Sequence, residues 1–164
     1  MKLIIHDLST REIERLNISL EAYQIISTDI KATYCQGCFG CWLKVPGKCV
    51  YKDKLQYIGA LLAQSEEVII ISRNCYGGYS YGIKKILDRS IAGNTPIFTY
   101  RRRKIHHACR YKNRPNLTVY LYGDMSALEK QIATELVQAN GVNMGCQNIK
   151  SFFLEDISEL RGRL

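Results

Sequence analysis

The sequence predicts an α/β fold, in which a five-stranded parallel sheet of strand order 2-1-3-4-5 lies between layers of helices in one doubly wound, three-layer domain. Short apolar runs alternate along the chain with segments of helical periodicity, which implies right-handed crossovers and a parallel sheet. The strongest run, Glu67 to Ser72, is continuously apolar at its centre, as a strand buried on both faces requires. The length of 164 residues suits one domain, residues 1–164, without a linker or an internal repeat.

The first strand and the first helix are predicted at the start of the chain. Leu3 to Ile5 is a short apolar run suited to a buried strand. Ser9 or Thr10 then caps a helix whose first turn carries Glu12 and Glu14, where the helix dipole favours acidic side chains.

A second strand, a loop and a second helix follow. Residues 22–27 contain Ile25 and Ile26 and predict a strand. The next segment is a cysteine-rich loop, residues 33–50, whose turn-forming residues are Gly37, Gly40, Pro46 and Gly47. Apolar residues then recur at helical spacing at Leu55, Ile58, Leu61 and Leu62.

The alternation continues after the strand at 67–72. A helix is indicated by apolar residues at i, i+3, i+4 and i+8, which are Ile83, Ile86, Leu87 and Ile91. Residues 117–122 and 148–154 predict strands four and five. The helix between them carries Leu128, Ile132, Leu136 and Val137, and Asn140-Gly141 predicts its end. A last helix of about two turns is expected from Ile157.

Strand order 2-1-3-4-5 is that of flavodoxin-like proteins, which bind ligands at the carboxyl ends of the strands, beside the point where the order reverses. The loops that follow the predicted strands are residues 7–11, 28–50, 73–80 and 122–126. The cysteine-rich loop and a glycine- and tyrosine-containing turn, Asn74 to Tyr79, are both among them. We therefore expect these two segments to share one functional edge of the sheet.

The composition is that of an ordinary globular protein, with 46% hydrophobic and 23% charged residues. A disordered tail, a collagen-like fibre and a short disulfide-stapled toxin are excluded. No run of about 18 apolar residues predicts a membrane span, and the start of the chain shows no secretory signal. We expect a cytoplasmic protein.

The formal net charge of +8 is concentrated in one basic segment, residues 101–115. This segment holds seven cations and no acid, and without it the 23 Lys and Arg fall to 16 against 15 Asp and Glu. The cations are Arg101, Arg102, Arg103, Lys104, Arg110, Lys112 and Arg114. Such a segment suits the phosphates of RNA or DNA, a phosphorylated cofactor, an acidic partner or a solvated loop. No RRM, KH or helix-turn-helix pattern accompanies it, which argues against nucleic acid.

Four of the seven cysteines lie close together, at Cys35, Cys38, Cys41 and Cys49. A group of cysteines in a chain without a secretory signal points to metal or redox chemistry rather than to disulfides. Three cysteines with two residues between neighbours, and a fourth after seven more residues, are able to wrap a [4Fe–4S] cluster. Zinc is a second interpretation, and structural or redox-active thiols without a metal are the third.

Two segments carry a resemblance to a known family. The first is Cys35-Gln-Gly-Cys38-Phe-Gly-Cys41-Trp42 with Pro46-Gly47-Lys48-Cys49-Val50 and Asp53. The second is Asn74-Cys75-Tyr76-Gly77-Gly78-Tyr79-Ser80 with Lys84 to Asp88-Arg89, and His106-His107 with Arg110-Tyr111 adds to it. Over about residues 30–120 the chain resembles flavodoxin-like NAD(P)H-dependent FMN reductases and their iron-sulfur flavoprotein relatives.

The resemblance implies FMN as a cofactor, NAD(P)H as the reductant, and electron delivery from the flavin to a small-molecule or protein acceptor. It places the flavin ring against Asn74, Cys75, Tyr76, Gly77, Gly78 and Tyr79. Glycines allow close approach of the backbone to a flat ring, and tyrosines stack on it. The family's Gly-Ser-rich phosphate loop is replaced here by a glycine-free stretch, in which Ser9, Thr10 and Arg11 are the candidate phosphate ligands.

Two other functions stay open at this point. One is a flavin-free binding or assembly module with a degenerate phosphate loop, and the other is a nucleic-acid binder acting through residues 101–114. A homodimer is expected, because the short helices predicted beside strands one and five leave an apolar sheet face uncovered. Asp88 and Arg89 are expected to form a structural ion pair.

Overall fold

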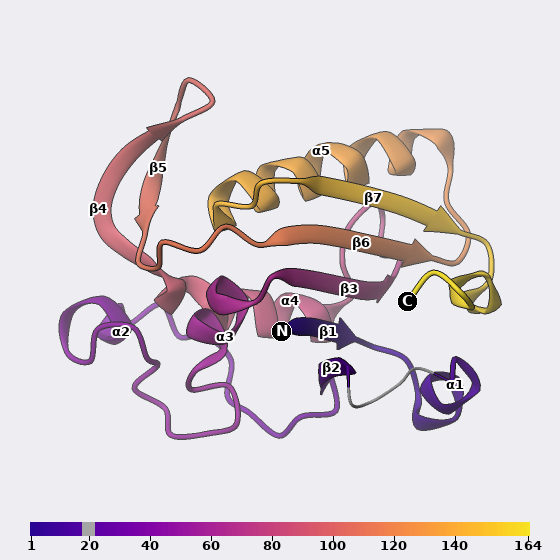
Figure 1. Ribbon diagram of the computed structural model, residues 1–164, viewed down its shortest axis with the longest axis horizontal. Helices are drawn as coiled ribbons and strands as arrows, with labels where there is room; N and C mark the ends of the chain where they lie inside the picture. Colours follow the sequence, from indigo (N-terminus) through magenta and orange to yellow (C-terminus); the bar gives the residue numbers. More distant parts are fainter. Residues whose placement is uncertain (18–21) are drawn as a thin grey trace.

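The computed structural model describes residues 1–17 and 22–164. Its centre is a parallel sheet of five strands in the order β2-β1-β3-β6-β7 (Figure 1). The strands are β1 (Lys2–His6), β2 (Tyr23–Ser27), β3 (Glu67–Arg73), β6 (Asn116–Tyr122) and β7 (Ile149–Leu154). Taken in sequence order, these are the five predicted strands in the predicted order 2-1-3-4-5, so the flavodoxin-like fold is confirmed.

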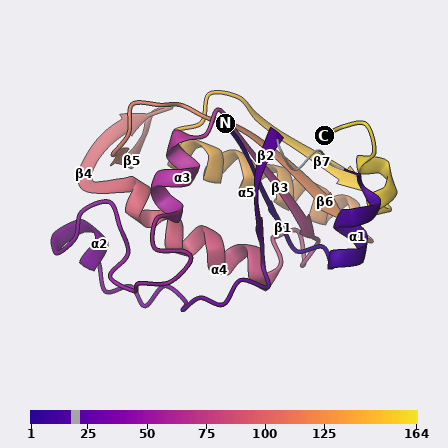
Figure 2. The ribbon, with the colours of Figure 1, turned by 60° about the horizontal axis from the view of Figure 1, so that its bottom comes forward.

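Three helices cover one face of the sheet: α3 (Ile58–Gln64), α4 (Tyr81–Arg89) and α5 (Ala127–Met144) (Figure 2). Their buried side chains and alternate residues of the strands form the larger of two hydrophobic cores, which includes Leu3, Val68, Leu117, Ile83, Ile86 and Val137. Complete burial of one such aliphatic side chain contributes about 1.5–3 kcal/mol. This core therefore fixes the positions of α4 and α5, which flank the candidate sites.

The opposite face is covered by α1 (Thr10–Arg15) and by the 3₁₀ turn η3 (Ile157–Leu160). A longer helix was expected from Ile157, and the structure has a single turn there instead. Even so, Ile4, Ile69 and Tyr120 on this face are only 0%, 4% and 5% exposed. The expected uncovered sheet face is therefore wrong, because Leu160 and its neighbours close this second core.

An antiparallel hairpin, β4 (Asn94–Arg101) and β5 (Lys104–Cys109), projects from the domain (Figure 1). This corrects the sequence analysis, which treats residues 101–115 as a basic segment and predicts no strand in it. The hairpin has no core face of its own, and four of its large apolar side chains are exposed: Ile97, Phe98, Tyr100 and Ile105. Without a buried face, its strands lack the apolar pattern that reveals a strand in a sequence.

Two shorter segments also differ from expectation. The cysteine-rich loop contains a one-turn helix, α2 (Gly40–Leu43). Helix α5 continues past Gly141 to Met144, and Gly145, with a φ of 75°, ends it. Gly141 is needed inside the helix, because a Cβ there would lie 2.5 Å from the Ile149 side chain. Among the described residues, no helix is long and apolar enough to cross a membrane.

Candidate functional site

The carboxyl edge of the sheet is organised by Asp7, which follows β1. Asp7 Oδ2 accepts a hydrogen bond from the Arg73 amide at 2.9 Å, and Oδ1 accepts one from the Tyr122 hydroxyl at 3.1 Å. Asp7 thereby ties the ends of β3 and β6 to the end of β1, beside the point where the strand order reverses. Burial, followed by the charge of Asp7, raises the pKa of Tyr122, so its hydroxyl stays protonated and donates to the carboxylate.

The start of α1, where a phosphate was expected, is already capped by the chain's own carboxylate. Glu12 Oε2 accepts hydrogen bonds from the Ser9 amide at 2.8 Å and from the Ser9 hydroxyl at 2.6 Å. These bonds, the one from the hydroxyl first, lower the pKa of Glu12, so it is ionised at neutral pH. Ser9 lines an open hollow beside the start of α1, and neither Thr10 nor Arg11 is part of the wall of that hollow.

The start of α4 presents donors that sequence reasoning missed. Ser80 is the N-cap residue, and the first turn of α4 carries no acidic residue. Its Oγ is buried and has no hydrogen-bond partner among the described residues. Ser80 lines the same hollow as Ser9. The available signal was its position directly before the helix at 81–89, because free amides of a helix start attract anions.

The Asn74–Tyr79 turn is braced against α5. The Asn74 side chain donates to the Asp124 carbonyl and accepts from the Gly77 amide, each at 2.9 Å. Gly77 has a φ of 79°, and a Cβ on it would lie 2.9 Å from the Glu129 carbonyl and 3.0 Å from Ile132. Its missing side chain therefore serves the packing of the turn on α5, rather than the approach of a ring from the open side.

The two tyrosines of this turn have different environments. Tyr76 is 88% exposed and free to stack on a planar ligand. Tyr79 is 8% exposed, and burial raises its pKa to about 12. The predicted stacking of Tyr79 on a ring does not agree with this burial, so Tyr76 is the aromatic side chain of the turn that a ligand reaches.

Two open hollows run along this edge and meet at Gly123, with volumes of about 730 and 650 Å³. Their walls carry seven carboxylates, from Asp7, Glu12, Asp29, Asp124, Glu129, Glu155 and Glu159. The two cations of the walls are Arg73 and Lys130. We call this surface the acidic edge. The phosphate of FMN would meet an excess of negative charge at this edge.

The cysteine-rich loop runs to the other end of the sheet, contrary to the expectation that it shares an edge with the 73–80 turn. It leaves β2 at the carboxyl edge and follows α4 backward. The Lys85 ammonium donates to the Thr28 and Ile30 carbonyls, each at 3.1 Å, and Arg89 donates to the Thr33 carbonyl. In both ribbon views, α2 lies at the end opposite to the strand arrowheads (Figures 1 and 2).

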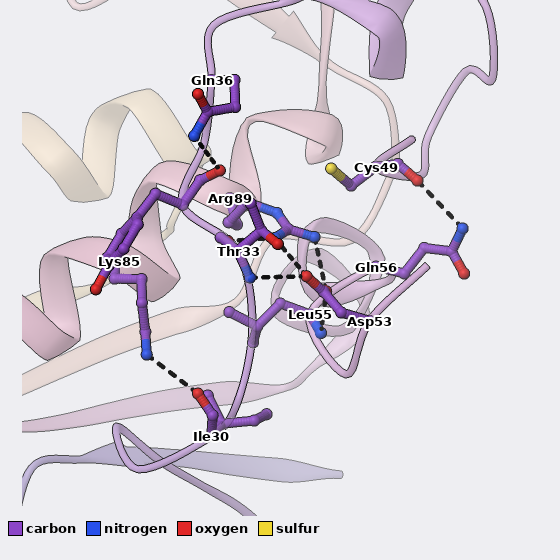
Figure 3. Close-up of polar contacts among 10 residues, drawn as sticks. Ile30, Thr33, Gln36, Cys49, Asp53, Leu55, Gln56, Lys85 and Arg89 are labelled. Carbon is purple, nitrogen blue, oxygen red and sulfur yellow. Dashed lines mark hydrogen bonds and ion pairs between the residues drawn. The ribbon is translucent and has the colours of Figure 1, made fainter. Parts of the chain in front are cut away.

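A buried ion pair fixes the loop at that end. The Arg89 side chain is fully buried, and its two terminal nitrogens donate to both Asp53 oxygens at 2.8 and 2.9 Å (Figure 3). Asp53 also accepts the Thr33 and Leu55 amides, each at 3.0 Å. Burial alone would raise the pKa of Asp53, but the bonds from Arg89 and these amides outweigh it and lower that pKa. The expected pair Asp88–Arg89 is wrong, because Asp88 pairs with Lys84.

All four cysteines of the predicted group line one apolar cavity of about 70 Å³. Cys41 is buried, and burial, followed by the neighbouring thiols, raises its pKa. Within residues 1–17 and 22–164, no three His, Cys, Asp or Glu side chains stand as ligands of one metal ion. Zinc needs its ligands at about 2.0–2.3 Å from a single ion. A [4Fe–4S] cluster binds each thiolate to a different iron, so it does not require the four thiols to converge on a single ion.

Aromatic rings join the cysteine-rich loop to the hairpin. Ring centroids are 5.1 Å apart for Phe39 and Trp42, 4.7 Å for Trp42 and His107, and 4.8 Å for His107 and Phe98. His106 turns the other way, with Nδ1 2.7 Å from Asn143 Oδ1 on α5. The adjacent histidines thus attach the hairpin to two different elements.

Two cations of the basic segment are bound within the domain. Arg101 donates to Cys109 Sγ and the His107 carbonyl, each at 2.8 Å. Arg110 donates to the Ala92 and Asn94 carbonyls, each at 3.2 Å. The exposed cations of the hairpin are at its tip, Arg102, Arg103 and Lys104. The solvated part of the basic segment is therefore smaller than its composition suggests.

No protein-family model matches the chain. The chain is similar to two curated proteins named iron-sulfur flavoprotein. That of Archaeoglobus fulgidus is 31% identical over 85 residues, which are 52% of this chain and 37% of the relative. That of Clostridioides difficile is 26% identical over 146 residues, which are 87% of this chain and 58% of the relative. The chain thus spans between a third and three fifths of the length of these relatives.

Solved structures share the fold. General stress protein 14 of Treponema denticola, in complex with FMN, has a TM-score of 0.57 at 11% identity, over 99% of this chain and 90% of that one. An FMN-dependent NADH-azoreductase of Bacillus anthracis, also in complex with FMN, has a TM-score of 0.55 at 11% identity, over 93% and 85%. These likenesses confirm the flavodoxin-like fold, and the two curated relatives confirm the sequence resemblance to iron-sulfur flavoproteins.

Proposed function

We propose that this chain is a flavin-dependent oxidoreductase module, similar to NAD(P)H-dependent FMN reductases, that passes electrons through bound FMN. The observation that carries the proposal is the convergence of Cys35, Cys38, Cys41 and Cys49 on one apolar cavity in a chain of this fold. The sequence similarity to iron-sulfur flavoproteins supports it. The proposed unit is the single domain 1–164, acting in the cytoplasm.

The four cysteines would hold a [4Fe–4S] cluster, which supplies one-electron transfer when bound. The chain's part is to place four thiols in a turn-rich segment, where Cys41 is buried and Cys35 and Cys38 are open to solvent. Phe39 and Ile91 supply apolar walls, and the buried Arg89 also lines the cavity. The Asp53–Arg89 pair holds this segment against α4.

FMN would lie at the carboxyl edge, with its ring beside Cys75 and Tyr76 and its polar end in the hollow that Ser9, Ser80 and Arg73 line. Ser80 Oγ and the start of α4 offer free donors there, whereas the Ser9 hydroxyl already donates to the Glu12 carboxylate. The flavin supplies hydride acceptance from NAD(P)H when bound. The residues of the edge bind and orient it, and the structure assigns no side-chain acid or base to the reaction.

One observation favours the flavin-free assembly module instead, namely the acidic edge itself. The iron and flavin contents of the full chain distinguish the two functions. They are measured after purification without oxygen and incubation with iron, sulfide and FMN. We expect about four irons per chain, and loss of most of the iron in Cys41→Ser. The matched control is Cys75→Ser, which lies outside the cavity and should keep its iron. Folded protein that retains neither iron nor flavin refutes the proposal.

A further inference from the structure

The Arg89 guanidinium is completely buried, and all of it but one group has a partner. Its two terminal nitrogens donate to both Asp53 oxygens at 2.8 and 2.9 Å, and one of them also donates to the Thr33 carbonyl. Its planar face lies over the Tyr51 ring, with Cζ 5.9 Å from the ring centroid. The exception is the Nε–H group, which is buried and has no hydrogen-bond partner among the described residues.

A buried donor without a partner is rare in a folded protein, so the surroundings of Arg89 Nε are informative. Arg89 lines the apolar cavity that all four cysteines of the group also line. Cys49 is the cysteine beside the guanidinium, and Figure 3 shows its sulfur directed toward that side. Burial alone would lower the pKa of Arg89, but its hydrogen bond to Asp53, followed by its interaction with Cys49, outweighs burial and raises that pKa. The free Nε–H is therefore next to a sulfur atom that is able to accept it.

Arg89 and Cys49 are held in place independently of each other. The Cys49 amide donates to the Gln56 carbonyl at 2.9 Å, and the Gln56 side chain donates to the Cys49 carbonyl at 3.2 Å. Arg89 is fixed instead by its two charge-assisted hydrogen bonds to Asp53. The fold thus sets the position of the donor relative to the sulfur before any ligand binds, as the supporting residues of a metal site do.

We propose that Arg89 Nε–H donates a hydrogen bond to the sulfur of Cys49 when the cysteines hold a [4Fe–4S] cluster, and that this bond raises the reduction potential of the cluster. The inference rests on the proposed function, because the cluster is part of it. Reduction adds one electron, and hydrogen bonds to the sulfurs stabilise the added negative charge. Asp53 neutralises the charge of Arg89, so the pair adds no net charge and the Nε–H donor carries the effect.

The variant that removes this donor most selectively is Arg89→Lys. The two side chains match up to Cδ, so a methylene replaces Nε–H while the lysine ammonium still faces Asp53. The matched control is Arg101→Lys, because Arg101 Nε is also buried and unpartnered among the described residues, but Arg101 does not line the cysteine cavity.

The measurement is an anaerobic redox titration of the iron-loaded full chain, followed by EPR. The midpoint potential should fall in Arg89→Lys by about 59 mV, which is a tenfold change in the equilibrium constant of a one-electron couple. It should keep the wild-type value in Arg101→Lys.

A second variant covers a loss of stability in Arg89→Lys, since lysine offers only one nitrogen to Asp53. The double variant Asp53→Asn/Arg89→Met removes both members of the buried pair, which is tolerated better than the loss of one. It also leaves the net charge of the chain unchanged. It lacks Nε–H as well, so its potential should fall in the same direction. A wild-type potential in either variant that keeps its iron overturns the proposal.

Pulsed EPR of the reduced wild type tests the hydrogen bond without any substitution at Arg89. The chain is produced with arginine isotopically labelled at Nε only. A magnetic coupling between the label and the cluster is expected in the wild type and in Arg101→Lys, and its loss in Arg89→Lys. Iron-loaded wild type without this coupling overturns the proposal and leaves the proposed function standing. Folded wild type that retains no iron refutes the proposed function, and this inference with it.

Discussion

Replacing Asp53 by Asn leaves the buried Arg89 guanidinium without its counter-charge. The Arg89 side chain is 0% exposed and that of Asp53 is 18% exposed, so solvent does little to replace the lost partner. Breaking a buried pair by removing one charge costs about 3–5 kcal/mol. Asn is nearly the same size and keeps one acceptor oxygen, so the loss reports the charge rather than a cavity. Because a domain is stable by only about 5–15 kcal/mol, the effect should be large.

Equilibrium unfolding in urea at neutral pH measures this loss. The matched control is Asp88→Asn on α4, next to Arg89. Its partner Lys84 is 60% exposed and Asp88 itself is 46% exposed, so the control should cost only about 0.3–0.5 kcal/mol. If Asp53→Asn costs no more than Asp88→Asn, the pair does not hold the cysteine-rich loop as described.

The pH dependence gives a second check on the same pair. The pKa of Asp53 is lowered below its ordinary 3.8 in the folded chain. Its contribution to stability is therefore fully present above pH 3.8 and is lost as the pH falls through the lowered folded-state pKa. The difference in unfolding free energy between the wild type and Asp53→Asn should shrink below that pH. A difference that is constant down to unfolding in acid would contradict this sign.

Two further predictions concern the carboxyl edge. Gly77→Ala should lower the melting temperature more than Gly162→Ala does. Both glycines have φ angles near 75–79°, but only Gly77 faces α5. The backbone strain shared by both variants is about 1–2 kcal/mol. Equal losses of melting temperature would show that α5 accommodates the added Cβ of residue 77 at no cost in stability. Tyr122→Phe removes the hydroxyl that donates to Asp7 and should cost about 1 kcal/mol in urea unfolding. No loss there would mean that the hydrogen bond does not tie β6 to β1.

The sheet is predictable from the sequence because its strands are buried and carry continuous apolar runs. Glu67 to Ser72 is the clearest case, and four of its side chains from Val68 to Ile71 are no more than 4% exposed. The hairpin β4–β5 is not predicted from the sequence, because its apolar residues point to solvent and no periodic core face marks its strands. Burial, rather than strand propensity, therefore decides which elements a sequence reveals.

The position of the candidate site depends on a contact between residues that are far apart in the sequence, which local patterns do not predict. The spacing of Cys35, Cys38 and Cys41 predicts that these residues act together, and they do line one cavity. The position of that cavity depends on a contact between Asp53 and Arg89, which are 36 residues apart. Nothing local in the sequence states that this pair forms instead of Asp88–Arg89. The loop therefore lies at the opposite end of the sheet from where strand order alone places it.

The most direct test of the central claim is anaerobic titration of the iron-loaded full chain with FMN, followed by NADH or NADPH. The account predicts that FMN binds stoichiometrically, that its fluorescence changes on binding, and that the nicotinamide bleaches its visible absorbance. The same chain should carry about four irons after desalting. Folded protein that leaves FMN free at every concentration and retains no iron would contradict the account.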